Sequence, residues 1–92
     1  MSSLELNISI YGKSALKYLW FMVEKVLPDL PDYHPNTVKV VELAKEKFFP
    51  MLDEMLKLDD PEDYEKFEEF NEICDKIADL IEEIGEECGN DN

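Results

Sequence analysis

An apolar seam with heptad spacing runs along the C-terminal third of the chain and constrains its fold more than any other feature. Successive members are separated by three and four residues in turn, which keeps their side chains on one face of an α-helix for three heptads. A helix with a single apolar stripe buries that stripe against other elements. The seam therefore predicts one long amphipathic helix packed on a helical core. Its members are Phe67, Phe70, Cys74, Ile77, Ile81, Ile84 and Cys88.

The start of this helix is marked by the sequence LDDPEDYEKF. Asp60 is predicted to cap the helix and Pro61 to occupy its first position, with acidic residues in the first turn. Gly85 or Gly89 is expected to end it, which leaves residues 90–92 as a frayed tail. A chain of 92 residues has room for one hydrophobic core, so residues 1–89 are predicted to form a single helical domain.

Acidic residues are concentrated in the same part of the chain. Residues 1–58 hold seven lysines and eight acids, whereas residues 59–92 hold two lysines and fifteen acids. The net charge of −14 therefore lies almost wholly in the C-terminal third. Direct binding of nucleic acid needs a basic surface that replaces the counterions of phosphate, and the sequence shows none. Anionic lipid would also repel this charge, so we expect neither nucleic acid nor a membrane as a direct partner.

The outer face of the long helix is predicted to carry most of these carboxylates. Such a face often serves only to keep a protein soluble. On an ordered element, however, a field of one sign also accelerates encounter with a surface of the opposite sign. We therefore expect a non-catalytic inhibitor or adaptor that presents a nucleic-acid-like carboxylate face to a basic partner protein. The residues expected to contact the partner are Glu65, Glu68, Glu69, Glu72, Asp75, Asp79, Glu82, Glu83 and Glu86.

In size and charge, the chain resembles the small acidic inhibitors that phages and mobile elements make. No sequence motif carries this likeness, so it implies a class of function and no particular partner. A basic nucleic-acid-binding protein is the kind of partner that such an inhibitor would occupy.

The N-terminal segment alternates between apolar and polar residues from Leu4 to Ile10. Strict period-two alternation is typical of a half-buried strand, and Gly12 is expected to end it. One strand cannot satisfy its own backbone, so it must pair with its copy in a dimer, with residues 38–43, or with the sheet of a partner. A homodimer is the expected solution, because two-fold dimers are the commonest oligomers.

The first helix is predicted from about Ser14 to Leu27 and stops at Pro28. It is apolar nearly all round, which indicates that more than one of its sides is covered. This excess of apolar surface favours a second hypothesis, in which the protein is a structural subunit of a homo- or hetero-oligomer assembled through its N-terminal strand and first helix. The residues assigned to self-association are Leu4, Leu6, Ile8, Ile10, Tyr18, Trp20 and Phe21.

A second helix is expected to begin at Asn36 or Thr37, after a stiff connector with three prolines. Its apolar stripe continues past Pro50, which should kink or break it. Residues 38–43 also fit a strand, although the long pattern after them favours a helix. The predicted fold is therefore a mainly α domain of three helices, the second kinked at Pro50, with one short N-terminal strand.

No arrangement typical of an enzyme or a cofactor site is present in the sequence. Gly12, Lys13 and Ser14 resemble the end of a phosphate-binding loop, but Asn7 stands where that loop needs its first glycine. The only histidine, His34, lies far from the two cysteines, so no zinc set forms. We therefore expect no catalytic activity, cofactor or metal. The N-terminus has no secretory signal pattern, and a cytoplasmic protein is expected.

Overall fold

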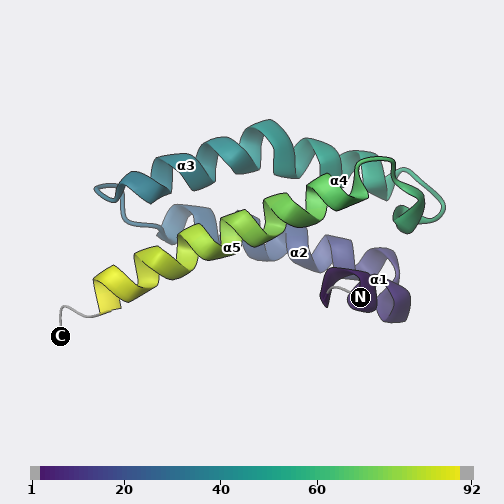
Figure 1. The fold of residues 1–92 in the computed structure, drawn as a ribbon, viewed down its shortest axis with the longest axis horizontal. Helices are drawn as coiled ribbons and strands as arrows, with labels where there is room; N and C mark the ends of the chain where they lie inside the picture. The colour runs from purple at the N-terminus through teal and green to yellow at the C-terminus, as the bar shows by residue number, and fades with distance from the viewer. Residues whose placement is uncertain (1–2, 90–92) are drawn as a thin grey trace.

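The computed structural model describes residues 3–89 and shows a mainly helical chain. A short helix at one end leads into three long helical segments that lie side by side along the molecule (Figure 1). The second of these segments along the chain, which contains α3 and α4, runs antiparallel to the other two, so α2 and α5 point in the same direction. The α-helices are α1 (Ser3–Tyr11), α2 (Lys13–Val26), α3 (Pro35–Leu43), α4 (Phe49–Leu56) and α5 (Phe67–Gly89).

The N-terminal segment is a helix, so the prediction of a strand over residues 4–10 was wrong. Leu4 and Ile8 are four residues apart and both turn toward the core, where Ile8 is 4% exposed. A helix satisfies its backbone through local hydrogen bonds, whereas the strand would have needed a partner, and no described segment of this chain forms a strand. The pairing of residues 4–10 with residues 38–43 is excluded as well, because these lie in α3.

Gly12 makes the sharp turn between α1 and α2. Its φ of 61° and ψ of −140° form a combination that residues with a Cβ atom rarely adopt. The amide N–H of Gly12 donates to the carbonyl of Ile8 at 2.7 Å and so closes the last turn of α1. The turn folds α1 back onto the start of α2, and Ile8 of α1 is buried in the core.

The predicted first helix is confirmed as α2, which ends in a 3₁₀ turn, η1 (Leu27–Asp29), at Pro28. The connector that follows is held down at both ends. Leu30 is 9% exposed, and the hydroxyl of Thr37 donates to the carbonyl of Pro31 at 2.6 Å. The connector thereby fixes where α3 begins.

The predicted second helix is continuous from α3 to α4 through a π-helical turn, η2 (Ala44–Phe48). Pro50 lacks an N–H, and in an unbroken α-helix its ring would clash with the carbonyl of Glu46. The wider π turn avoids this clash, with the N–H of Phe49 donating to the carbonyl of Ala44. The irregularity expected at Pro50 is therefore a π turn just before it, and we refer to α3, η2 and α4 together as the central rod.

The sequence LDDPEDYEKF contains a cap, but the long helix begins later than predicted. Asp60 accepts a hydrogen bond at 3.0 Å from the N–H of Glu62, and Pro61 opens a single 3₁₀ turn, η3 (Pro61–Asp63). The chain is extended at Tyr64, whose hydroxyl donates to the carboxylate of Glu54. α5 starts at Phe67 and reaches Gly89, so Gly85 does not end it. The predicted tail, residues 90–92, lies outside the described residues.

The core forms where α5 crosses the central rod. Phe48 of η2 stacks on Phe70 of α5 with ring centroids 5.5 Å apart. Ile77 and Ile84 continue the contact along α3. The long helix is thus clamped along its seam, which leaves its opposite face in solvent. The buried apolar residues include Leu16, Val23, Val40, Ala44, Phe48, Leu52, Met55, Phe70, Ile73, Ile77 and Ile84.

His34 joins the start of α3 to the end of α5. Its Nδ1 accepts a hydrogen bond from the N–H of Asn36 at 3.1 Å, so its Nε2 carries the proton that is donated to Glu87 at 2.5 Å. Replacing His34 by Ala should lower the free energy of unfolding by about 1–2 kcal/mol, because the cap and the partly buried hydrogen bond to Glu87 are both lost. His34→Asn, which keeps an effective cap, should lose less than half of that. Urea titrations followed by circular dichroism will rank the two variants, and equal losses would contradict the role of the cap.

Candidate functional site

Six of the nine predicted contact residues form a straight row on the solvent side of α5. They are separated by four, three, four, three and four residues, which places them on one face, opposite the buried seam. All six are exposed, and within residues 3–89 none makes a hydrogen bond or an ion pair. We call this row the acidic ridge, and it consists of Glu68, Glu72, Asp75, Asp79, Glu82 and Glu86.

The other three predicted acids are also exposed, but they differ from the ridge residues in their contacts or in their place in the chain. Glu69 forms an ion pair with Lys47 of the central rod at 3.4 Å. Glu83 accepts a hydrogen bond from the side chain of Asn36 at 2.7 Å. Glu65 precedes α5 and belongs to the turn before it. Two of these acids therefore fasten α5 to the rod, and the ridge keeps its carboxylates unpaired.

The ridge is a linear array of charge on a rigid support. From Glu68 to Glu86 it spans eighteen residues, or about 27 Å at 1.5 Å per residue. This gives one carboxylate for about every 5 Å, compared with about 3.4 Å between phosphates along one strand of DNA. The ridge thus matches a nucleic-acid strand in sign and linearity, at a lower density of charge.

The residues assigned to self-association divide into two groups. Ile8 is buried, and Leu4 and Trp20 are partly buried, all within this chain. The ring of Trp20 packs against that of Phe49 at 4.9 Å between centroids, and its Nε1 donates to Glu24 at 2.8 Å. The remaining four residues are exposed: Leu6 by 51%, Ile10 by 61%, Tyr18 by 65% and Phe21 by 58%.

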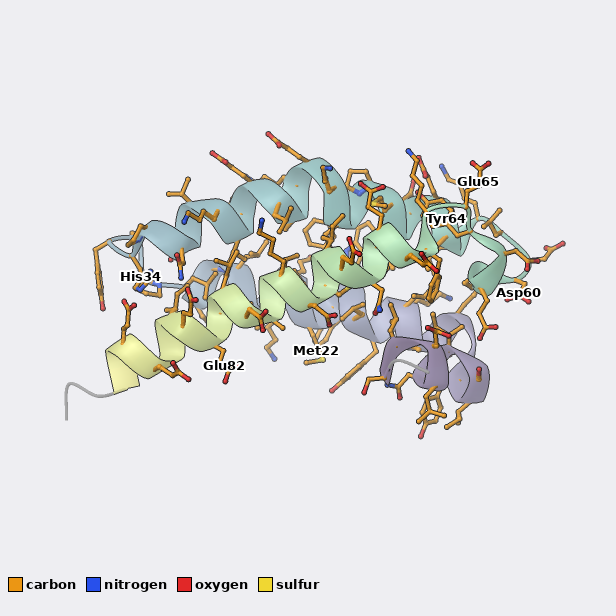
Figure 2. The ribbon with its side chains drawn as sticks, viewed as in Figure 1. Met22, His34, Asp60, Tyr64, Glu65 and Glu82 are labelled. Carbon is orange, nitrogen blue, oxygen red and sulfur yellow. The ribbon has the colours of Figure 1, made fainter. Side chains whose placement is uncertain are left out.

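An apolar groove between α2 and α5 was not predicted. Both helices pack on the central rod but touch each other sparsely, and a groove of ≈ 370 Å³ lies between them. Figure 2 shows Met22 of α2 and Glu82 of α5 along the edge where the two helices face each other. The sequence contained one sign of it, the apolar wrap of the first helix. The groove is lined by Leu19, Met22, Val23, Val26, Phe48, Cys74, Ile77, Ala78, Ile81 and Glu82.

Cys74 lies in the wall of this groove, and its thiol is held in the protonated form. Burial, followed by the neighbouring charge of Asp75, raises the pKa of Cys74 from 9.0 to about 12. The thiolate is the reactive species, so alkylation at pH 8 should be about 1,000-fold slower than in the unfolded chain. Mass spectrometry of a Cys88→Ser variant treated with iodoacetamide will measure this rate. A rate that levels off near pH 9 would contradict the raised pKa.

The same pKa shift makes stability depend on pH. Above pH 9 the unfolded chain releases the proton of Cys74, whereas the folded chain keeps it until about pH 12. The unfolded state then binds fewer protons, so the contribution of this thiol to stability is complete below pH 9 and is lost between pH 9 and 12.

Comparison with known proteins gave no match to a family model, to a curated protein or to a solved structure. Among the described side chains, those of residues 3–87, no three histidine, cysteine or acidic groups come together as they would around a metal ion. Over the same residues, every helix is too short or too polar to cross a membrane. The ridge and the groove are therefore the features from which a function can be argued.

Proposed function

We propose that this protein is a non-catalytic binding module that presents its acidic ridge to a basic surface of a partner protein, as an inhibitor or an adaptor. One observation carries the proposal: six carboxylates stand unpaired in a row on a helix whose opposite face is locked into the core. An array used only for solubility needs no such order. A rigid row instead forms ion pairs with little loss of conformational freedom, since the backbone beneath it is already fixed.

The charge distribution supports the same proposal. The ridge belongs to a C-terminal third with thirteen more acids than lysines, while the rest of the chain is nearly neutral. A field of this kind steers a basic partner toward α5 and accelerates encounter at low salt. Proteins with a basic surface that binds nucleic acid are one class of partner, because the ridge is a linear array of negative charges like the phosphates of a nucleic-acid strand.

The test compares two variants with the same net charge. The ridge variant, Glu72→Gln, Asp75→Asn, Asp79→Asn and Glu86→Gln, removes four ridge charges. The matched control, Asp29→Asn, Asp32→Asn, Glu42→Gln and Glu46→Gln, removes four exposed charges from other elements. Glu68 is retained in the ridge variant because it stabilises the first turn of α5.

The immobilised proteins are exposed to a lysate of the cells that encode them, at about 50 mM salt and then at about 500 mM. A basic protein should be retained by the wild type and the control, be missing from the ridge variant, and be released at high salt. If the ridge variant retains the same proteins as the wild type, the ridge is not the binding surface.

A second candidate function, a structural subunit of an oligomer, is favoured by the exposed apolar side chains of α1 and α2. Leu6, Ile10, Tyr18 and Phe21 are each more than half exposed, and a cleft of ≈ 550 Å³ lies where α1 meets α2. Such a subunit would associate through apolar contacts and tolerate salt. Phe21→Ala should then lower the mass measured by sedimentation equilibrium at about 500 mM salt without unfolding the chain. A wild type that is monomeric under these conditions would exclude self-association.

A further inference from the structure

The groove between α2 and α5 has the form of a missing helix position. α2 and α5 lie on the same central rod and run in the same direction (Figure 1), and the groove is lined by residues of both helices. In antiparallel helical bundles, such a position is filled by a further helix whose apolar stripe packs on both neighbours. Phe48 forms the floor, and every residue of the lining except Glu82 is apolar. The groove therefore offers a helix an apolar seat.

The seat extends beyond the groove itself. The cleft between α1 and α2 shares Leu19 and Met22 with the groove, so the two are neighbours along α2, and we refer to them together as the channel. The channel reaches from Ser14 to Val26, a distance of about 18 Å at 1.5 Å per residue. This length corresponds to about three turns of a helix, or some twelve residues.

The charges beside the channel select the occupant. Glu82 lies in its lining, and Asp75 lies on the ridge two turns of α5 before it. The acid of α2, Glu24, lies outside the lining and accepts a hydrogen bond from Trp20 at 2.8 Å, so the acidic residues beside the groove belong to α5. A helix with lysine or arginine beside its apolar stripe would place them against α5. A second copy of this chain would instead bring another net charge of −14 to the same place.

We infer that the channel, which runs along α2 and includes the groove between α2 and α5, binds a cationic amphipathic helix of the partner protein. Its apolar residues at positions i, i+3, i+4 and i+7 seat in the channel, and its basic flank pairs with Asp75, Asp79 and Glu82. This inference rests on the proposed function and specifies the form in which the basic partner meets the ridge. The apolar contact holds the helix, and the ridge sets its orientation and speeds its arrival.

The test uses a synthetic peptide of about fourteen residues with a leucine stripe and lysines along one flank. A scrambled peptide of the same composition lacks the stripe, and a third peptide carries glutamate in place of lysine. Ala78→Trp places an indole in the channel at an exposed position, leaving the core untouched. Val38→Trp is the matched control, because Val38 is 55% exposed on α3, outside the lining of the channel.

Calorimetry should show that the wild type binds the striped lysine peptide at least tenfold more tightly than either of the other two peptides. Ala78→Trp should lose at least tenfold in affinity, and Val38→Trp should lose none. In the Cys88→Ser background, the bound peptide should also slow alkylation of Cys74, which lines the groove. Circular dichroism and a urea titration of each variant establish that it is folded.

Each contrary result has its own meaning. Equal binding of the striped and scrambled lysine peptides, unchanged by Ala78→Trp and weakened in the ridge variant, would overturn the channel and leave the acidic ridge as the binding surface. Binding of the glutamate peptide as tightly as the lysine peptide would overturn the choice of a cationic helix. A dimer of the wild type that Ala78→Trp dissociates would show that a second copy fills the channel. No binding of either lysine peptide would overturn the channel, while the lysate experiment still decides the ridge.

Discussion

Converting four of the six ridge carboxylates to amides is expected to weaken binding of a basic partner about 30-fold at low salt, while making the protein itself more resistant to urea. The variant is Glu72→Gln, Asp75→Asn, Asp79→Asn and Glu86→Gln. Each exposed ion pair across an interface contributes little, but four aligned pairs and the loss of steering together reach this size. The difference from the wild type should nearly vanish at about 500 mM salt, where the charges are screened.

The expected gain in stability has a separate cause. The ridge residues are spaced three and four apart, so neighbouring carboxylates on α5 repel one another, and none of them forms an ion pair among the described residues. The amides keep the size and nearly the helix propensity of the acids they replace. Opposite changes in binding and stability would identify the ridge as a surface whose charge costs stability and supports function. If the affinity and the urea midpoint both fall, the carboxylates stabilise the fold and the proposal fails.

The long helix was predictable because its pattern is long. Phe70, Ile77 and Ile84 are all buried as expected, since three heptads of consistent spacing leave few alternative structures. The exposure of the ridge residues follows from the same period, because they lie opposite the seam. Glu69 and Glu83 could not be separated from them, since their contacts are with Lys47 and Asn36, which are distant in sequence.

The N-terminal segment shows where a short pattern fails. Alternation over Leu4 to Ile10 also places Leu4 and Ile8 one helical turn apart, so the same seven residues fit a strand and a helix. The chain adopts the helix, because that choice needs no partner. The groove was beyond sequence reasoning for a related reason. The stripes of α2 and α5 predict that each helix packs on something, but not how far apart the rod holds them.

Replacing Phe48 by Ala is expected to lower the free energy of unfolding by about 3–5 kcal/mol, out of a total of about 5–15 kcal/mol for a domain of this size. Phe48 is fully buried, and its ring contacts Phe49 at 5.1 Å and Phe70 at 5.5 Å between centroids. It is one of the residues through which the central rod holds α5. Urea titration should therefore show a large fall in midpoint, and Phe48→Leu, which fills most of the space, should recover more than half of it.

Phe21→Ala is the matched control, because it removes the same ring from a position that is 58% exposed. Phe21→Ala should lower the free energy of unfolding by less than about 1 kcal/mol. Because both variants remove the same phenyl ring, the difference between them measures the effect of burial. Equal midpoints would mean that the contact between the rod and α5 contributes little to folding. The ridge would then lack the rigid support that the proposed binding requires, and both the ridge and the channel beside it would have to be reconsidered. If the urea midpoint falls only for Phe48→Ala, the contact of Phe48 with Phe70 contributes to holding α5, and with it the ridge, in place.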